Sequence, residues 1–150
     1  MKQLHHVLAS LLSPSLWKGE LLAWRVAEEV KTVCYMQWLV LPQNEKGEIA
    51  CEQKVYFPDK SKSQVNHFVF SKINSQGFSL QVHHPQYGQI CGTGLQQEGV
   101  LGWELEGVQN QFSGVEIYEN LSPTLYLLQG DYQEDFGAYS SMSGRLWRFR

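Results

Sequence analysis

Short segments in which apolar and polar residues alternate follow one another from Trp17 to Arg150, and turn residues close each segment. Because no helical period separates them, the pattern predicts an antiparallel meander. A long open sheet would expose two edges, so the favoured fold is an all-β, up-and-down antiparallel β-barrel of about ten strands. The predicted strands are 17–25, 31–41, 48–57, 64–73, 78–83, 89–94, 99–106, 111–119, 124–132 and 138–148.

The third predicted strand shows the alternation most clearly. Ile49, Cys51 and Val55 share one face, whereas Glu52 and Lys54 share the other. A strand that is buried on one side only has this period of two. We therefore expect one face of each strand to point into the barrel.

A short amphipathic helix is predicted before the barrel. Leu4 and Leu8 fall at helical spacing, and Pro14 stops the pattern. With 150 residues the chain is long enough to bury one core without metals or disulfides. We expect a single domain, with the leading helix at 1–13 and the barrel at 17–150.

Large aromatic side chains fall where the alternation places them on one wall of the sheet. An interior lined by rings suits a planar or chain-like apolar ligand, but the same rings can simply fill a small barrel. Both interpretations stay open at this point. The aromatic candidates for ligand contact are Trp38, Phe68, Phe70, Trp103, Tyr118, Tyr126 and Tyr139.

Two charged residues lie on these aromatic faces and are further candidates for ligand contact. Glu116 shares a strand face with Tyr118, and Arg145 shares one with Tyr139 and Trp147. A charge on an aromatic face needs a partner or a ligand if that face points inward. Arg145 would then orient a ligand carboxylate, whereas on an outward face it is an ordinary solvated residue. Both faces of the last strand mix polar and apolar residues, so the choice stays open.

The composition narrows the classes of partner. The formal net charge is −3, and charged residues make up only 18% of the chain, so no basic field gathers phosphates and we expect no nucleic-acid partner. No segment has the length of a transmembrane helix or the pattern of a signal peptide. We therefore expect a cytoplasmic protein that does not associate with a membrane.

Cysteine and histidine usage does not indicate catalysis or metal binding. The three cysteines, Cys34, Cys51 and Cys91, are odd in number and lie in strand-like segments, so we expect buried thiols. His83 and His84 are adjacent and face opposite sides of a strand, which separates them as metal ligands. No nucleophile elbow accompanies them. We predict no catalytic residue and no metal site.

Two segments, one at each end of the barrel region, carry a family resemblance. Residues 12–20, Leu-Ser-Pro-Ser-Leu-Trp-Lys-Gly-Glu, are similar to the Leu-x-Gly-x-Trp-x-Gly opening of several families in the calycin superfamily of lipocalin-like and fatty-acid-binding-protein-like barrels, with Ser15 in place of the first glycine. Residues 137–148 are similar to the last strand of these barrels and, loosely, to that of the S-type phycobilin lyases. The resemblance implies that Trp17 packs against Arg148 or Arg145 through a cation–π contact.

Three functional hypotheses follow. The first is non-catalytic binding, without a cofactor, of a small hydrophobic ligand, which in one form carries an acidic group. The second, implied by the resemblance to S-type lyases, is a chromophore lyase or chaperone that handles a bilin, a linear tetrapyrrole. The third is a filled barrel that binds a protein, with the chain itself a monomer or homodimer. Haem is disfavoured, because haem-binding barrels of the nitrobindin kind use a histidine near the C-terminus and no histidine follows His84.

Overall fold

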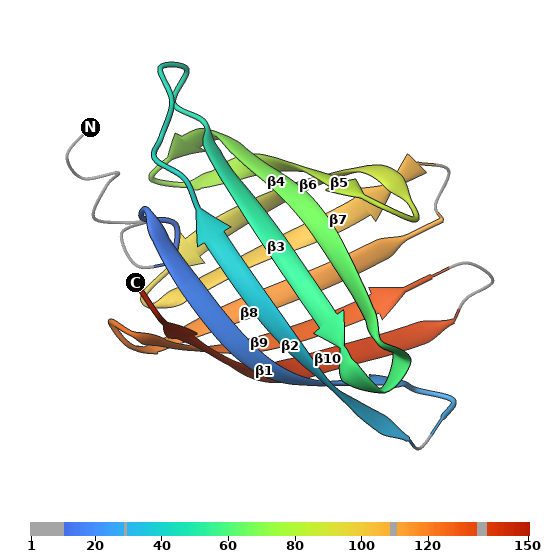
Figure 1. Cartoon of the computed structure of the whole chain (residues 1–150). Coiled ribbons are helices and arrows are strands. Elements are labelled where there is room, and N and C mark those ends of the chain that lie inside the picture. The colour runs from blue at the N-terminus through green and yellow to red at the C-terminus, as the bar shows by residue number, and fades with distance from the viewer. Residues whose placement is uncertain (1–10, 29, 109–110, 135–137) are drawn as a thin grey trace.

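The chain folds into a closed antiparallel barrel of ten strands (Figure 1). The computed structural model describes residues 11–28, 30–108, 111–134 and 138–150. Each strand pairs with its neighbours along the chain, and pairing of the first strand with the last closes the ring. The strands are β1 (Ser15–Arg25), β2 (Lys31–Val40), β3 (Ile49–Phe57), β4 (Lys62–Asn74), β5 (Gly77–His84), β6 (Gly88–Gln97), β7 (Val100–Gly107), β8 (Ser113–Ser122), β9 (Leu125–Gln133) and β10 (Tyr139–Arg148). The predicted all-β, up-and-down barrel is confirmed.

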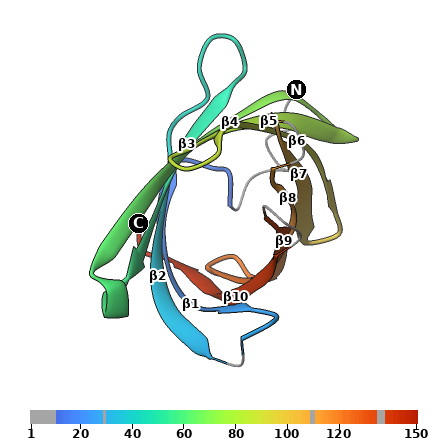
Figure 2. The same cartoon turned by 90° about the vertical axis from the view of Figure 1, so that its right-hand side faces the viewer.

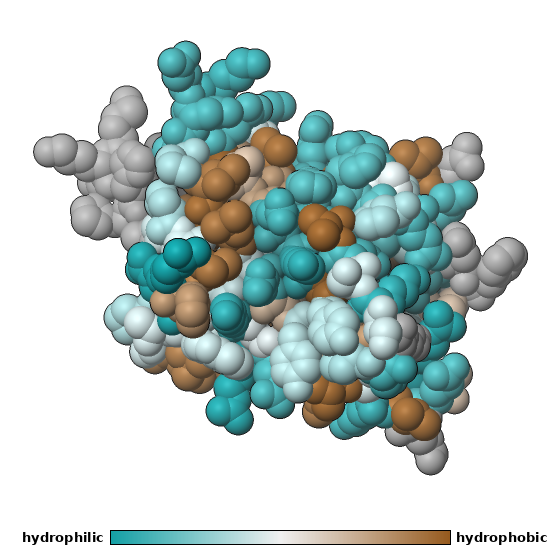
Figure 3. Space-filling view, viewed as in Figure 1, coloured by the Kyte–Doolittle hydropathy of each residue, from teal (hydrophilic) through white to brown (hydrophobic). Residues whose placement is uncertain are grey.

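The alternation along the strands decides which residues enter the core. In β3, Ile49, Cys51, Gln53 and Val55 are buried, and the alternate residues Ala50, Glu52 and Lys54 are exposed. β8 repeats the pattern with Gly114, Glu116 and Tyr118 inside. On the face shown in Figure 3, hydrophilic residues cover much of the surface and apolar residues form separate patches between them. The period of two thus sets both the inner and outer faces of the barrel.

The leading helix predicted for 1–13 falls largely outside the described residues. Leu11 and Leu12 are described, and they lie in a turn with their side chains buried in the core. A short 3-10 turn, η1 (Pro58–Lys60), lies between β3 and β4. No helix in those ranges is long and apolar enough to cross a membrane.

The two ends of the barrel differ. Aromatic rings fill the end near the chain termini: Trp38 meets Phe68 edge-on at 5.0 Å between ring centroids and stacks on Trp103 at 6.5 Å. Tyr118 lies 4.7 Å from Trp103. The opposite end, which faces the viewer in Figure 2, carries the turns that join β1 to β2 and β5 to β6. This second end is where the interior opens.

Candidate functional site

A cavity of about 310 Å³ occupies the open end of the barrel. We call this cavity the cup. All ten strands contribute to its lining, and its floor includes the buried residues Gln53, Phe68, Leu105 and Glu116. Below them lie the packed rings of the filled end. The barrel therefore has a blocked end and a cup that faces solvent, in the lower size range of small-molecule sites.

A buried carboxyl group forms part of the cup floor. Glu116 is 4% exposed, and its Oε1 accepts hydrogen bonds from Trp103 Nε1 at 2.8 Å and from the Tyr118 hydroxyl at 3.2 Å. Its Oε2 accepts a short hydrogen bond from the Tyr132 hydroxyl. Burial raises the pKa of Glu116, and the three hydrogen bonds oppose that rise. The group is a buried acid surrounded by neutral donors.

Two glycines allow Tyr132 to reach Glu116. Gly130 lies directly opposite Glu116 in the β8–β9 ladder, and a Cβ atom there would collide with the phenol of Tyr132. A Cβ atom on Gly114 would lie 2.7 Å from Cδ1 of the same ring. The Tyr132 ring thus lies flat over space that side chains would otherwise fill. Its hydroxyl is held against the carboxyl group as a result.

A chain of polar side chains crosses the opposite wall of the cup. Asn66 Nδ2 donates to Gln53 Oε1 at 2.7 Å, and Gln64 Nε2 donates to Asn66 Oδ1 at 3.1 Å. The chain ends at His84, whose Nε2 lies 3.0 Å from Gln64 Nε2. Gln53 and Asn66 are buried, so these hydrogen bonds satisfy amides that would otherwise be costly to bury.

The tautomer of His84 follows from its second ring nitrogen. Nδ1 accepts hydrogen bonds from the backbone N–H groups of Gln86 at 3.0 Å and Tyr87 at 3.2 Å. A neutral imidazole has one N–H, which must then be on Nε2. This N–H needs an acceptor. Rotating the amides of Gln64, Asn66 and Gln53 together by 180° supplies the Gln64 oxygen and reverses the direction of the polar chain, at the cost of the weak contact of Gln53 with Met36. Partial burial lowers the pKa of His84, which favours the neutral form.

Aromatic rings surround the mouth of the cup next to His84. The His84 ring lies 5.1 Å from that of Tyr87 and 6.2 Å from that of Phe112. Phe112 in turn lies 5.8 Å from Tyr132. The Tyr87 hydroxyl donates to Glu134 Oε1 at 3.0 Å, which ties the β5–β6 turn to the end of β9. This wall offers a flat aromatic surface to a ligand.

Seven of the nine candidate ligand-contacting residues lie in the barrel interior, but only two of them line the cup. Phe68 and Glu116 line it. The others pack within the core of the barrel, so their rings fill space and do not border the cavity. These core residues are Trp38, Phe70, Trp103, Tyr118 and Tyr126.

The structure places Tyr139 and Arg145 on the outer face of β10, an orientation that the sequence left open. Tyr139 is 56% exposed, and Arg145 is also exposed. On β10 the inward positions are instead Met142, Gly144 and Leu146, which alternate with them. Because serines and other small residues lie on both faces of β10, the sequence does not show which face of this strand points inward. Arg145 therefore lies where it cannot orient a ligand carboxylate inside the barrel.

Trp17 is fully buried, but its partners differ from those that the resemblance implied. Its Nε1 donates to Ser15 Oγ at 2.8 Å, and its ring meets Tyr126 edge-on at 5.3 Å. Arg148 is opposite Trp17 in the β1–β10 ladder, yet its side chain is exposed.

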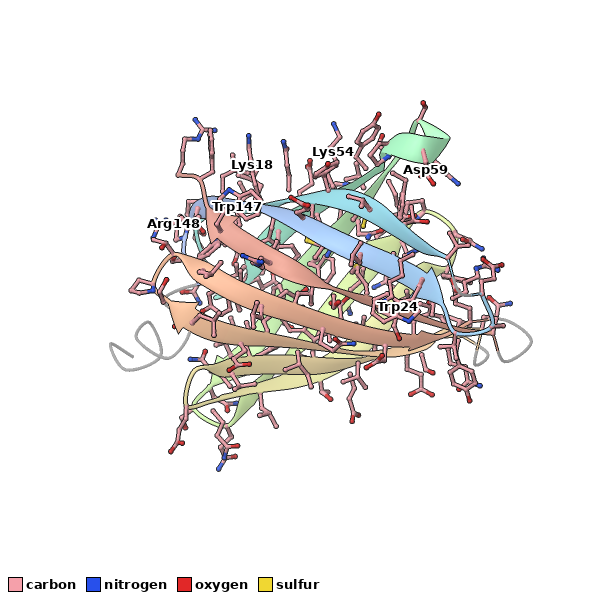
Figure 4. The ribbon with its side chains drawn as sticks, turned by 90° about the horizontal axis from the view of Figure 1, so that it is seen from below. Lys18, Trp24, Lys54, Asp59, Trp147 and Arg148 are labelled. Atoms are coloured by element: carbon pink, nitrogen blue, oxygen red, sulfur yellow. The ribbon has the colours of Figure 1, made fainter. Side chains whose placement is uncertain are left out.

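The basic groups at this end of the barrel are near the outer surface. Figure 4 shows Arg148 near Lys18 and Trp147, away from the barrel interior. Among the described residues, the cation–π contacts are those of Lys18 with Phe149 and of Lys31 with Trp24. The expected contact of Trp17 with an arginine is thus replaced by aromatic packing.

The cysteines follow the prediction in two of three cases. Cys34 and Cys51 are buried, and burial raises the pKa of Cys34 to about 11 and that of Cys51 further. Cys91 is exposed, which corrects the expectation that all three are core residues. Within the described ranges, no group of three histidine, cysteine or acidic side chains is placed to hold a metal ion.

The barrel is similar in fold to solved structures of other proteins. No protein-family model and no curated protein matches the sequence. The fold is similar to an S-type phycobiliprotein lyase, CPES from Guillardia theta, with a TM-score of 0.67 and 12% identity over 92% of this chain and 89% of that one. It is also similar to EF1p2_mFAP2b bound to DFHBI, with a TM-score of 0.53 and 14% identity over 95% of this chain and 97% of that one. At these identities the likeness is one of fold, and it confirms the expected similarity to the phycobilin lyases at that level.

Proposed function

We propose that the protein binds a small, largely apolar molecule in the cup, without chemistry of its own. The observation that carries this proposal is the cup itself. Its volume of about 310 Å³ combines apolar walls with a few buried polar groups, the usual composition of a ligand site. The structural neighbour whose barrel is bound to DFHBI supports the use of such a fold for a small ligand.

The arrangement of the polar groups favours binding over catalysis. Glu116 is held by three donors, and His84 is fixed by two backbone N–H groups. Neither has a serine, threonine, cysteine or lysine side chain within its described hydrogen-bond network. Preorganised groups of this kind orient a ligand and give specificity.

The direct test pairs a variant that fills the cup with a matched outward variant. Ala23 lines the cup, so Ala23→Phe would fill part of it, whereas the neighbouring Leu22 is 39% exposed on the outer face. The probe is N-phenyl-1-naphthylamine, a neutral apolar dye whose fluorescence rises on leaving water. We expect micromolar-class binding, about −8 kcal/mol, that Ala23→Phe removes and Leu22→Phe retains. Equal binding by the Ala23→Phe variant would contradict the proposal.

A bilin lyase or chaperone is the competing function, favoured by the similarity in fold to CPES. Arg145 is exposed, so it is not available inside the barrel to orient a ligand carboxylate such as a bilin propionate. The remaining test uses Glu116. A visible-absorption change when the protein is mixed with a linear tetrapyrrole, lost in Glu116→Gln, would support this alternative. The absence of any spectral change at high tetrapyrrole concentration would exclude it.

A further inference from the structure

Most of the charged residues that line the cup are acidic. Among the described lining residues, the carboxyl groups are those of Glu28, Glu116 and Glu134, and the permanently charged cation is Arg25. Arg25 is exposed at the end of β1, whereas Glu116 is on the floor. The only other basic group in this lining, His84, has its pKa lowered by burial. A ligand that enters deeply therefore meets a carboxyl group with no cationic neighbour.

Glu116 has room for one more hydrogen bond. An ionised carboxylate offers about four lone-pair sites, and Trp103, Tyr118 and Tyr132 occupy three of them. All three partners donate, so they stabilise the ionised form without neutralising it. A buried carboxylate is costly to leave without a counter-charge. A positively charged donor from the ligand would supply that charge and fill the remaining site.

The walls specify the shape of the rest of the ligand. Phe68 on the floor and Phe112 and Tyr132 on the wall all line the cup, and the Phe112 and Tyr132 rings are inclined by 32° to each other. Flat rings bury much apolar surface against such walls and also favour contact with a cation. A planar aromatic body with one cationic group matches both the walls and the floor.

We propose that the cup selects planar aromatic cations, such as aryl amidines, and holds the positive group on Glu116. This inference rests on the proposed function and deepens it by naming the ligand class. It replaces the hydrophobic acid considered from the sequence, because a ligand carboxylate would face Glu116 and Glu134 with no interior cation in the described lining.

Binding of a cation should be coupled to the ionisation of Glu116. The acid is protonated more readily than an exposed glutamate, so an amidinium that binds the carboxylate displaces its proton. Tyr118 and Tyr132 stay neutral because burial and the nearby carboxyl group raise their pKa values far above 10. Of the other titratable groups, Glu28, His84 and Glu134 belong to the lining, and Asp131 lies on the outer side of β9. Amidine affinity should therefore rise with pH as Glu116 ionises.

The test uses three probes of nearly equal shape and different charge: 2-naphthamidine, 2-naphthamide and 2-naphthoate. At pH 8 we expect the amidine to bind the wild-type protein at least about tenfold more tightly than the amide, with the naphthoate weakest, because charge-assisted hydrogen bonds are the stronger ones. Between pH 5 and 8 the affinity should rise for the amidine and change little for the amide. These comparisons use the unaltered protein and do not depend on the folding of a variant.

Two variants assign the preference to one carboxyl group. In Glu116→Gln the advantage of the amidine over the amide should fall to about threefold or less, whereas Glu119→Gln, on the exposed face of the same strand, should retain it. Binding of N-phenyl-1-naphthylamine shows that each variant still has a folded cup. If the amide or the naphthoate binds the wild type as tightly as the amidine while the dye still binds, the charge preference is wrong and the cup remains a site. If neither the dye nor any naphthyl probe binds, the proposed function itself fails.

Discussion

Replacing Glu116 by glutamine should change how the stability of the protein depends on pH. Glutamine keeps the shape of the side chain: its oxygen can accept from Trp103 and Tyr118, and its amide can donate to the Tyr132 hydroxyl, which turns to accept. The exchange therefore retains the hydrogen-bonded geometry. It removes the carboxyl group of this cluster, whose pKa burial raises above that of an ordinary glutamate.

The sign follows from linkage. The pKa of Glu116 is higher in the folded than in the unfolded protein, because burial disfavours the charged form. Between the two pKa values the unfolded state binds fewer protons, so stability falls as pH rises. The slope approaches about 1.4 kcal/mol per pH unit for one group in that window and vanishes above the folded pKa. Below the pKa of the unfolded state, Glu116 is protonated in both states, so its full contribution to the stability of the protein is present there.

Urea unfolding followed by tryptophan fluorescence at intervals from pH 4.5 to 8 measures this effect. We expect the free energy of unfolding of Glu116→Gln to rise relative to that of the wild type as pH increases. Glu119→Gln is the matched control, because Glu119 is exposed on the same strand. Its pH profile should follow that of the wild type. Parallel profiles for wild type and Glu116→Gln across this range would refute the assignment of a raised pKa to Glu116.

Three further substitutions test other parts of the structure. Trp17→Ala should lower the free energy of unfolding by about 3–5 kcal/mol, since a fully buried ring is lost; a change within about 0.5 kcal/mol in urea unfolding would contradict this. Gly130→Ala should displace Tyr132 and cost about 1–3 kcal/mol, and a wild-type midpoint would show that the ring does not need the space. His84 has a lowered pKa, so its contribution is present above its unfolded pKa near 6.5 and is lost as pH falls through the folded value. His84→Asn should flatten that acid-side loss in unfolding curves, and an unchanged slope would argue against it.

The barrel could be predicted from the sequence because its signals are local. Turn residues divide the chain into segments, and alternation within β3 and β8 states which side is buried. Ring closure then follows from the cost of exposed edges. The last strand was the exception: Ser140 and Ser141 occupy opposite faces of β10, so polarity did not distinguish them. As a result, Tyr139 and Arg145 could not be assigned to the outer surface from the sequence.

The cup was harder to predict than the barrel because it depends on contacts between side chains of different strands. Glu116 was found from its position on an aromatic face, but its partners Tyr132 and Trp103 come from the two strands that flank it. One feature of the sequence does indicate the polar wall of the cup. Gln53 and Asn66 fall on the apolar faces of β3 and β4, and a polar residue in such a position requires a partner inside the barrel.

No local sequence pattern indicates the depth at which the barrel interior changes from packed rings to an open cavity. Trp38, Phe70 and Trp103 have the same alternation as Phe68, yet only Phe68 borders the cavity. The difference arises from how rings of several strands meet across the barrel, as in the contact of 5.4 Å between Phe70 and Trp103. Side-chain volume in three dimensions decides this, and a single strand does not encode it.

The central claim, that a ligand occupies the cup above Glu116, is tested most directly by the indole N–H resonances of the protein during titration with 2-naphthamidine. The chain has five tryptophans, and Trp103 alone donates its indole N–H to Glu116 among the described contacts. We predict a saturable shift of the Trp103 resonance, with those of buried Trp17 and of Trp147 on the outer face unchanged. A saturable shift at Trp147 with none at Trp103 would place binding on the outer surface and contradict the account.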